Sequence, residues 1–181
     1  MKALIFDPFS GATGVMIVGS LLDLVADTGK ILSMTDFGIG GGLSVESLQA
    51  GGLRFLGVSA DMQRAYQVRS FSGLAETVKQ VLPSGKAKED ALGVLALIAE
   101  AESAVKGTAA RESLTGDQGG GQLLFEIVAS CTALNELAPD CVLCTPVNAG
   151  GRRLFPTDKT PPVPSPIVLE ILKRSGLPFY G

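Results

Sequence analysis

The stretch that decides the fold is residues 2–25, which read KALIFDPFSGATGVMIVGSLLDLV. It begins with a short apolar run, Lys2–Phe6, which is typical of a β-strand, and Asp7-Pro8 ends that run. A glycine-containing turn follows, and over Val15–Val25 the apolar residues recur close to the 3.6-residue spacing of a helix. A strand, a turn and a helix in direct succession indicate a protein that contains both α and β structure.

The rest of the chain continues to alternate between the two patterns. Further helices are predicted over Gly73–Leu82, Lys86–Lys106, Gln122–Leu137 and Pro166–Ser175. Further strands are predicted over Leu43–Leu48, Phe55–Met62 and Cys141–Val147, with glycine-rich breaks at Gly38–Gly42 and Gly116–Gly121. The pair Gly51-Gly52 predicts a hairpin between the first two of these strands. We therefore expect an α/β fold, with α+β as the alternative, in which helices cover a mixed β-sheet.

Length, composition and charge narrow the class of protein. A chain of 181 residues can bury a core without disulfides or a structural metal, so we expect one compact domain over residues 1–181. A net charge of −3 without a basic cluster argues against nucleic-acid binding. The apolar runs are too short to span a membrane, and three cysteines fit a reducing cytoplasm. The 46% of hydrophobic residues fits a homo-oligomer or a protein partner, although a generous core would look the same.

The sequence contains no histidine. Nucleophile activation by a Ser-His-Asp or Cys-His arrangement is therefore excluded, and so is an imidazole ligand for zinc or nickel. Any proton transfer must use Asp, Glu, Lys, Tyr or Cys.

The turn after the first strand is the first candidate binding site. Backbone amides at the start of a helix can hold an anion, and the hydroxyl of Ser10 or Thr13 can add a donor. Asp7, at the tip of the strand, is placed to hold a metal ion that bridges to such an anion. The alternative is that Ser10 or Thr13 only caps the helix and that Gly11 and Gly14 only make the turn. No Gly-Lys-Ser/Thr sequence is present, so this turn is not a P-loop.

The cysteines form a second candidate. Cys141 and Cys144 make one CxxC, which is half of a zinc ribbon, and Cys131 alone is a poor third ligand. Residues three apart in a strand point to opposite faces, so these two thiols cannot chelate one ion together. We expect free thiols in a core or an interface.

Two glycine-rich segments complete the search for sites. Gly116–Gly121, ahead of the helix that carries Glu126, fits a second anion nest or a mobile loop. Arg152 and Arg153 follow a glycine pair, and they fit either a phosphate clamp or a solvated turn.

Several stretches resemble, in order, the motifs of the LarC-type nickel-insertion proteins. The matches are Asp7–Met16 with D-P/A-F-S-G-I-S-G-D-M, Ala99–Gly107 with A-E-A-E-x-x-V-H-G, Glu126–Val128 and Ala133-Leu134 with D-I-V-G…A-L, Pro162–Pro166 with P-V-P-A-P, and Pro178–Gly181 with P-V-Y-G. The resemblance covers the whole chain but only the N-terminal part of the family, whose full-length members continue into a further domain. It implies a protein that uses CTP to insert nickel into a pyridinium bis-thiocarboxylate mononucleotide, making the nickel-pincer cofactor of lactate racemase.

The chain departs from that family at its polar positions. Val15 stands where the family has the aspartate of S-G-D-M, and Lys106 stands where it has the histidine of V-H-G. The family's H-F-H-E-V-G-A-x-D-S block falls at residues 114–123, where only Asp117, in place of the glutamate, is acidic, and another family histidine falls at about Asp158. Nickel prefers imidazole or thiolate, whereas the oxygens of Asp7 and Asp117 suit a hard ion such as magnesium or manganese beside a nucleotide.

These departures lead to one leading prediction of function and two alternatives. The leading one is a divergent homologue of the nickel-insertion protein, with a phosphate- or nucleotide-binding turn at residues 10–14 and without nickel delivery. The first alternative is a non-catalytic partner or regulatory module that binds a full-length family member or a related enzyme. The second is an enzyme that uses Asp7 on a different nucleotide-like ligand.

Overall fold

The computed structural model of the chain describes residues 1–35, 43–60, 68, 70–107, 120–151 and 163–181. The chain divides into two compact units, each built from segments distant in sequence. The terminal unit consists of Met1–Ala12, Leu97–Ala109 and Pro139–Gly181, and the hairpin unit of Thr13–Ala96 and Ala110–Ala138. One helix, α4 (Lys86–Lys106), contributes its first half to the hairpin unit and its second half to the terminal unit.

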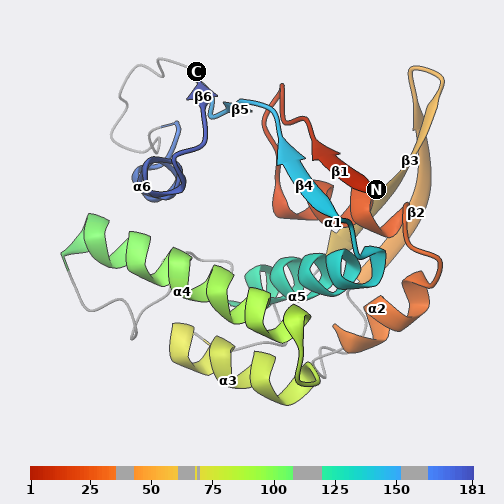
Figure 1. Cartoon of the computed structure of the whole chain (residues 1–181), viewed down its shortest axis with the longest axis horizontal. Helices are drawn as coiled ribbons and strands as arrows, with labels where there is room; N and C mark the ends of the chain where they lie inside the picture. Colours follow the sequence, from red (N-terminus) through yellow and green to blue (C-terminus); the bar gives the residue numbers. More distant parts are fainter. Residues whose placement is uncertain (36–42, 61–67, 69, 108–119, 152–162) are drawn as a thin grey trace. The chain divides into compact units, whose positions relative to one another are not determined.

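The hairpin unit is built around the helix α5 (Gly120–Leu137). Its other elements are α1 (Gly14–Leu22), α2 (Thr28–Met34), β2 (Leu43–Ala50), β3 (Leu53–Ala60) and α3 (Phe71–Val81). The helices α1, α2 and α3 all contact α5 (Figure 1). Leu124, Phe125 and Val128 of α5 are fully buried, and α5 is apolar on most of its faces, as expected for a central helix.

The hairpin β2–β3 forms where the sequence predicts it. Gly51 and Gly52 have φ values of +58° and +80°, the left-handed conformation that a two-residue hairpin turn requires and that glycine adopts without strain. The strand β3 also contacts α1. The contact is close because Gly19 has no side chain: a Cβ at this position would lie 2.5 Å from the carbonyl oxygen of Leu56.

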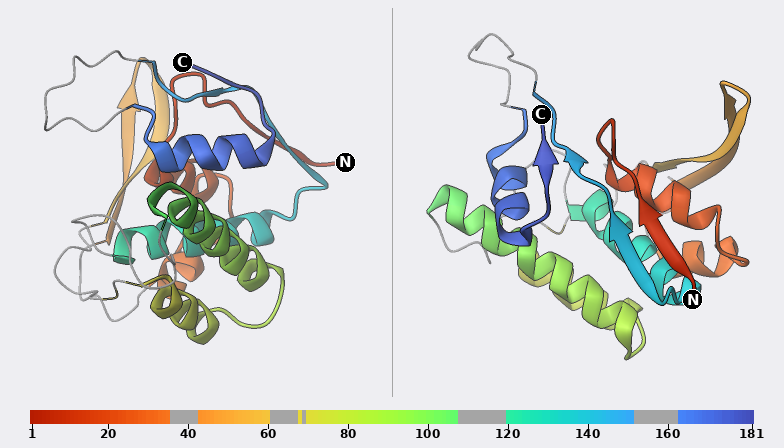
Figure 2. Two further views of the ribbon diagram at one scale, coloured as in Figure 1. Left: turned by 90° about the vertical axis from the view of Figure 1, so that its left-hand side faces the viewer. Right: turned by 45° about the horizontal axis from the view of Figure 1, so that its top comes forward.

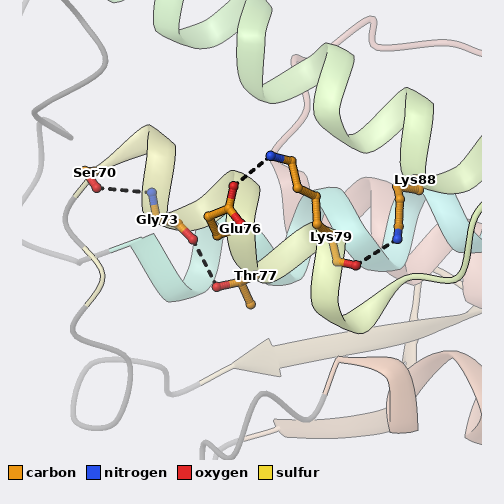
Figure 3. A network of polar contacts seen from close by, with 6 residues as sticks. All are labelled: Ser70, Gly73, Glu76, Thr77, Lys79 and Lys88. Carbon is orange, nitrogen blue, oxygen red and sulfur yellow. Dashed lines mark hydrogen bonds and ion pairs between the residues drawn. The ribbon is translucent and has the colours of Figure 1, made fainter.

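Polar contacts hold the ends of α3 (Figure 3). Ser70 caps the helix, since its hydroxyl accepts a hydrogen bond of 3.2 Å from the Gly73 amide. The Thr77 hydroxyl donates to the Gly73 carbonyl at 3.1 Å. At the other end, the Lys88 ammonium donates to the Lys79 carbonyl at 2.7 Å, which joins the last turn of α3 to α4.

The terminal unit contains two parallel strand pairs. The strand β1 (Ala3–Phe6) pairs with β4 (Cys141–Cys144), and β5 (Val147–Asn148) pairs with β6 (Phe179–Tyr180); each pair lies side by side in Figure 2. The helix α6 (Pro166–Ser175) lies between β5 and β6 in the chain.

Sequence signals at both ends of α6 explain its bounds. The Ser165 hydroxyl accepts from the Val168 amide at 3.3 Å, and Pro166 occupies the first turn. Gly176 ends the helix with a φ of +66°. Arg174 joins α6 to the second half of α4 through an ion pair of 3.2 Å with Glu100.

The predicted α/β class is confirmed, and the main correction concerns the sheet. The strands of the described segments form three separate pairs, two parallel and one antiparallel, in place of one mixed sheet. The antiparallel pair β2–β3 belongs to the hairpin unit, whereas the parallel pairs β1–β4 and β5–β6 belong to the terminal unit. The strands that the sequence predicts in one sheet are therefore divided between the two units. The expectation of one domain stays a prediction.

The largest differences from the predicted elements are two changed bounds and two elements that the sequence did not predict. The helix predicted over Val15–Val25 ends at Leu22, and the strand predicted over Cys141–Val147 is broken at Pro146, which has no amide hydrogen to donate. The elements α2 and β6 were not predicted. The break at Gly38–Gly42 lies outside the described residues. No helix in the described part of the chain is both long and apolar enough to cross a membrane.

Candidate functional site

Asp7 lies at the carboxyl end of β1, beside Thr145 at the carboxyl end of β4. The two strands are parallel and in register, with Phe6 opposite Cys144, so the residues that follow them leave at the same edge. The Thr145 amide donates to the Phe6 carbonyl at 2.9 Å. The Thr145 hydroxyl donates to Oδ1 of the exposed Asp7 carboxylate at 2.5 Å. A carboxylate and a hydroxyl therefore meet at the edge where parallel sheets commonly bind ligands.

The turn after Asp7 is held by hydrogen bonds from the end of the chain. The carbonyl oxygen of Phe9 accepts two of them, from the Asn148 side-chain amide at 2.9 Å and from the Tyr180 hydroxyl at 3.1 Å. The Pro8 carbonyl accepts from the amides of Gly11 at 3.0 Å and Asn148 at 3.2 Å. Gly11 has a φ of +83°, which favours glycine. The segment next to Asp7 is thus fixed by residues from β5 and β6.

Thr13 and Gly14, the remaining residues of the predicted site, form the amino end of α1 in the hairpin unit. The Thr13 hydroxyl accepts from the Met16 amide at 3.3 Å, so Thr13 has the helix-capping role that the sequence left as the alternative. The carboxylate of Glu126 lies against Gly14, where a Cβ would overlap it. Gln122 orients this carboxylate with a hydrogen bond of 3.0 Å. A negative charge of the protein itself therefore lies at the end of α1 that was predicted to hold an anion.

The structure separates the predicted ligand residues into two groups. Asp7, Ser10 and Gly11 belong to the terminal unit, and Thr13 and Gly14 belong to the hairpin unit. Ser10 is exposed. Asp117, Arg152, Arg153 and Asp158 lie outside the described residues, as does most of Gly116–Gly121, of which Gly120 and Gly121 form the start of α5.

The cysteines have three different environments. Cys141 and Cys144 lie in β4 as predicted, Cys141 half-buried and Cys144 exposed, and both are free thiols. Cys131 is buried in α5, where burial and the nearby Asp90 carboxylate raise its pKa to about 11. Within the described residues, no three His, Cys, Asp or Glu side chains are grouped so that they could hold a metal ion.

Two hollows lie within the separate units. In the hairpin unit, a hollow of about 560 Å³ lies between α1 and β3 and has mostly apolar walls. It is lined by Val15, Met16, Gly19, Ser20, Asp23, Leu24 and residues 55–58. A smaller one, of about 300 Å³, adjoins Tyr180 and Gly150 in the terminal unit. Apolar walls do not suit a phosphate, so the larger hollow is not part of the predicted anion site.

Sequence reasoning missed Thr145, Asn148 and Tyr180. Their partners, Asp7 and Phe9, are more than 130 residues away in the chain, and only the parallel pairing of the strands brings them together. One signal was available: Thr145-Pro146 directly follows a strand pattern, and a proline there marks the end of the strand and the start of a loop.

Comparisons with known proteins identify the family. The family model for the nickel insertion protein matches residues 4–178. The chain is 33% identical over 181 residues to a putative nickel insertion protein of Methanococcoides burtonii and 34% identical over 182 residues to one of Methanosarcina barkeri, and each match covers 100% of this chain and 46% of the relative. It is 26% identical over 185 residues to the pyridinium-3,5-bisthiocarboxylic acid mononucleotide nickel insertion protein of Staphylococcus saprophyticus, covering 99% of this chain and 46% of that protein.

The chain spans about half the length of the curated relatives it matches. No solved structure matches it. The match to the family model extends over almost the whole chain and so includes both units. The chain therefore belongs to the nickel insertion protein family.

Proposed function

We propose that this chain is a divergent homologue of the protein that inserts nickel into the nickel-pincer nucleotide cofactor, and that it does not deliver nickel itself. Membership of the family and the similarity to the Staphylococcus saprophyticus protein support the first part of this proposal. The second part is supported by one contact in the terminal unit, between Glu102 and Lys106 of α4.

The Lys106 ammonium forms an ion pair with the Glu102 carboxylate one helical turn away. Glu102 is only 3% exposed. In the family motif that this segment resembles, the position of Lys106 is a histidine, which would present an imidazole on the same side of the helix as Glu102. A protonated amine offers no lone pair to a metal and repels a cation. Lys106 thus places a positive charge beside Glu102. A histidine at the same position would instead form, together with Glu102, a pair of ligands for a metal ion.

The remaining donors favour a hard cation over nickel. Asp7 and Thr145 present a carboxylate oxygen and a hydroxyl oxygen, which suit magnesium or manganese carried by a phosphate. Cys141 and Cys144 are three residues apart in β4, and side chains at that spacing point to opposite faces of a strand. Their thiolates therefore do not form a pair that would select nickel.

The ligand that we propose is a nucleotide or another phosphate compound, bound at Ser10 and Gly11, the part of the predicted turn that lies in the terminal unit, with Asp7 toward the cation. Support comes from the fixed conformation of this turn, which Asn148 and Tyr180 hold through the Phe9 carbonyl. A turn that is already ordered loses little entropy when a ligand binds. Asp117, predicted as a second acidic ligand, stays a prediction.

Equilibrium dialysis of the purified, untagged chain against nickel tests the absence of nickel delivery. We expect no tight site in the wild type and the same result for D7A. The variant K106H places an imidazole one turn from Glu102, so it should bind nickel more tightly than the wild type and serves as the positive control. Wild-type binding of one nickel per chain at micromolar or lower Kd would contradict the proposal and restore nickel delivery.

A second candidate function is a non-catalytic partner or regulatory module, and the sheet β1–β4 favours it. Ile5 and Leu143 lie opposite each other on one face of that sheet and are 60% and 52% exposed. A protein partner would cover this exposed apolar pair. Light scattering of the chain alone, and mixed with a full-length nickel insertion protein, should show a homo-oligomer or a mixed complex; a monomer in both samples would exclude this candidate.

A further inference from the structure

The outer edge of β2 carries backbone groups that have no partner within the hairpin. The two residues that flank a two-residue hairpin turn, here Ala50 and Leu53, exchange backbone hydrogen bonds, and bonded and non-bonded pairs then alternate along the strands. The amides and carbonyls of Val45, Ser47 and Gln49 therefore point away from β3. None of them bonds to another backbone group in the described part of the chain.

The outer edge of β3 differs because α1 lies along it. Arg54 of β3 forms an ion pair of 2.8 Å with Asp23, which directly follows α1. One turn earlier in the helix, the Leu56 carbonyl lies so close to Gly19 that a Cβ there would be 2.5 Å from its oxygen. Of the two outer edges of the hairpin, only that of β2 is therefore open to another strand.

The sequence of β2 lacks the features that usually protect such an edge. Proteins protect edge strands with lysine, proline, a bulge or a covering segment. The strand reads LSVESLQA, without lysine or proline, and it pairs with β3 without interruption over all eight residues. Ser44 and residues 46–50 are exposed. A regular, exposed edge of this kind is a template for the addition of another strand.

We propose that β2 pairs in antiparallel orientation with β2 of a second copy of this chain, about a two-fold axis at Ser47, so that two hairpins form one four-stranded sheet. A two-fold contact occupies the open edge of both chains at once, whereas an unrelated strand covers the edge of one chain only. Because α1 covers the outer edge of β3 in each copy, the new sheet ends there and association stops at a dimer.

Charge and length select the register of this pairing. Glu46 is the only charged residue of β2, and an axis at Glu46 would place two carboxylates directly opposite each other, which is destabilising. An axis at Ser47 places Glu46 opposite Leu48 of the second copy and brings the two Ser47 hydroxyls together, where they can form a hydrogen bond. An axis at Val45 or Gln49 would shorten the overlap of the two strands. The three outward-facing pairs of the Ser47 register supply about six backbone hydrogen bonds.

An exchange of charge at Ser47 tests the proposed contact. In S47K two lysines meet at the axis, and in S47E two glutamates meet there, so each variant alone should dimerise up to about fivefold more weakly than the wild type. An equal mixture of the two variants pairs lysine with glutamate and should dimerise at least as tightly as the wild type. This pattern requires that residue 47 meets its own copy. The Ser47 side chain is exposed, so both variants should fold.

Sedimentation equilibrium over a series of protein concentrations gives the Kd of the dimer, since the mass of the wild type should rise from the 18.6 kDa of one chain toward that of two. S84K and S84E make the same changes at an exposed serine of the same unit and should keep the wild-type Kd. I5K alters the exposed face of β1–β4 and should also leave this dimer intact. Circular dichroism verifies that each variant is folded.

Three results would overturn the inference. The first is a wild type that stays a monomer up to its limit of solubility. The second is a mixture of S47K and S47E that dimerises no better than either variant alone. The third is a dimer that is lost in I5K and kept in S47K, which would place the contact on β1–β4. None of these results bears on the proposed ligand, because β2 and the residues around Asp7 belong to different units.

Discussion

The substitution Gly19→Ala tests how α1 is seated on β3. The Cβ of an alanine would lie 2.5 Å from the carbonyl oxygen of Leu56, whereas a carbon and a carbonyl oxygen are ordinarily at least about 3.3 Å apart. The difference, about 0.8 Å, must come from movement of the helix or the strand, because a carbonyl oxygen in a paired strand cannot rotate away.

The net effect follows from two opposing terms. Forcing a methyl group into such a contact costs about 3 kcal/mol, at the upper end for overpacking, because backbone has to move. Alanine returns about 1 kcal/mol through its higher helix propensity. The expected loss is therefore about 2 kcal/mol, which lowers the Tm of a chain of this length by about 4–8 °C.

Gly93→Ala is the matched control. Gly93 lies in the part of α4 that belongs to the hairpin unit, is exposed, and has no atom within 4 Å of its added Cβ position. Only the propensity term remains, so this variant should gain about 1 kcal/mol and about 2–4 °C. The assay is thermal unfolding followed by circular dichroism at 222 nm. Equal changes of Tm in the two variants would refute the reasoning.

Three further predictions concern other parts of the hairpin unit and one exposed thiol. Thr132→Val should stabilise the protein by about 1 kcal/mol in urea unfolding, because the buried Thr132 hydroxyl has no hydrogen-bond partner among the described residues; a loss of stability would show that it does have one. With Ellman's reagent at pH 8, the exposed Cys144 should react first. Cys131 should react only on unfolding, because it is buried and its pKa of about 11 keeps it a thiol. Rapid labelling of Cys131 in the folded protein would contradict its burial. Glu126→Gln should tighten inorganic phosphate binding about two- to fivefold in calorimetry, because it removes a negative charge beside the start of α1; an unchanged Kd would place the phosphate elsewhere.

Local sequence signals were sufficient to predict the bounds of those helices that have a glycine or a capping residue at their ends. The bounds of α4 and α6 agree with the predicted ones, because glycines follow both and a serine cap precedes α6. The short helix α2 was missed because its seven residues hold too few apolar positions to show a period, although Asp27 caps it by accepting from the Lys30 amide. The two-residue strand β6 was missed for the same reason of length.

The site was less accessible to sequence reasoning than the helices. Asp7 could be named as a candidate because a carboxylate directly after a strand is a local signal, and its role as a ligand stays a prediction. The pairing of Asp7 with Thr145, and of Phe9 with Tyr180, depends on which strands lie side by side, and strand pairing over such distances in the chain leaves no local pattern. The close approach of the Glu126 carboxylate to Gly14 likewise depends on how α5 packs on α1.

The opening motif, residues 7–14, thus has two structural roles, although the sequence analysis predicts it as one binding site. Its first half, Asp7 to Gly11, is fixed by β4, β5 and β6, whereas its second half, Thr13 and Gly14, caps α1 and receives the Glu126 carboxylate. A substitution in the second half should therefore act first on the stability of α1, and one in the first half on the contacts with β4, β5 and β6. Val15, which stands where the motif that this stretch resembles has an aspartate, lies next to the second half, in the first turn of α1. The hydrogen bond between Asp7 and Thr145 lies in the terminal unit, so a change at Val15, in the hairpin unit, leaves that contact in place.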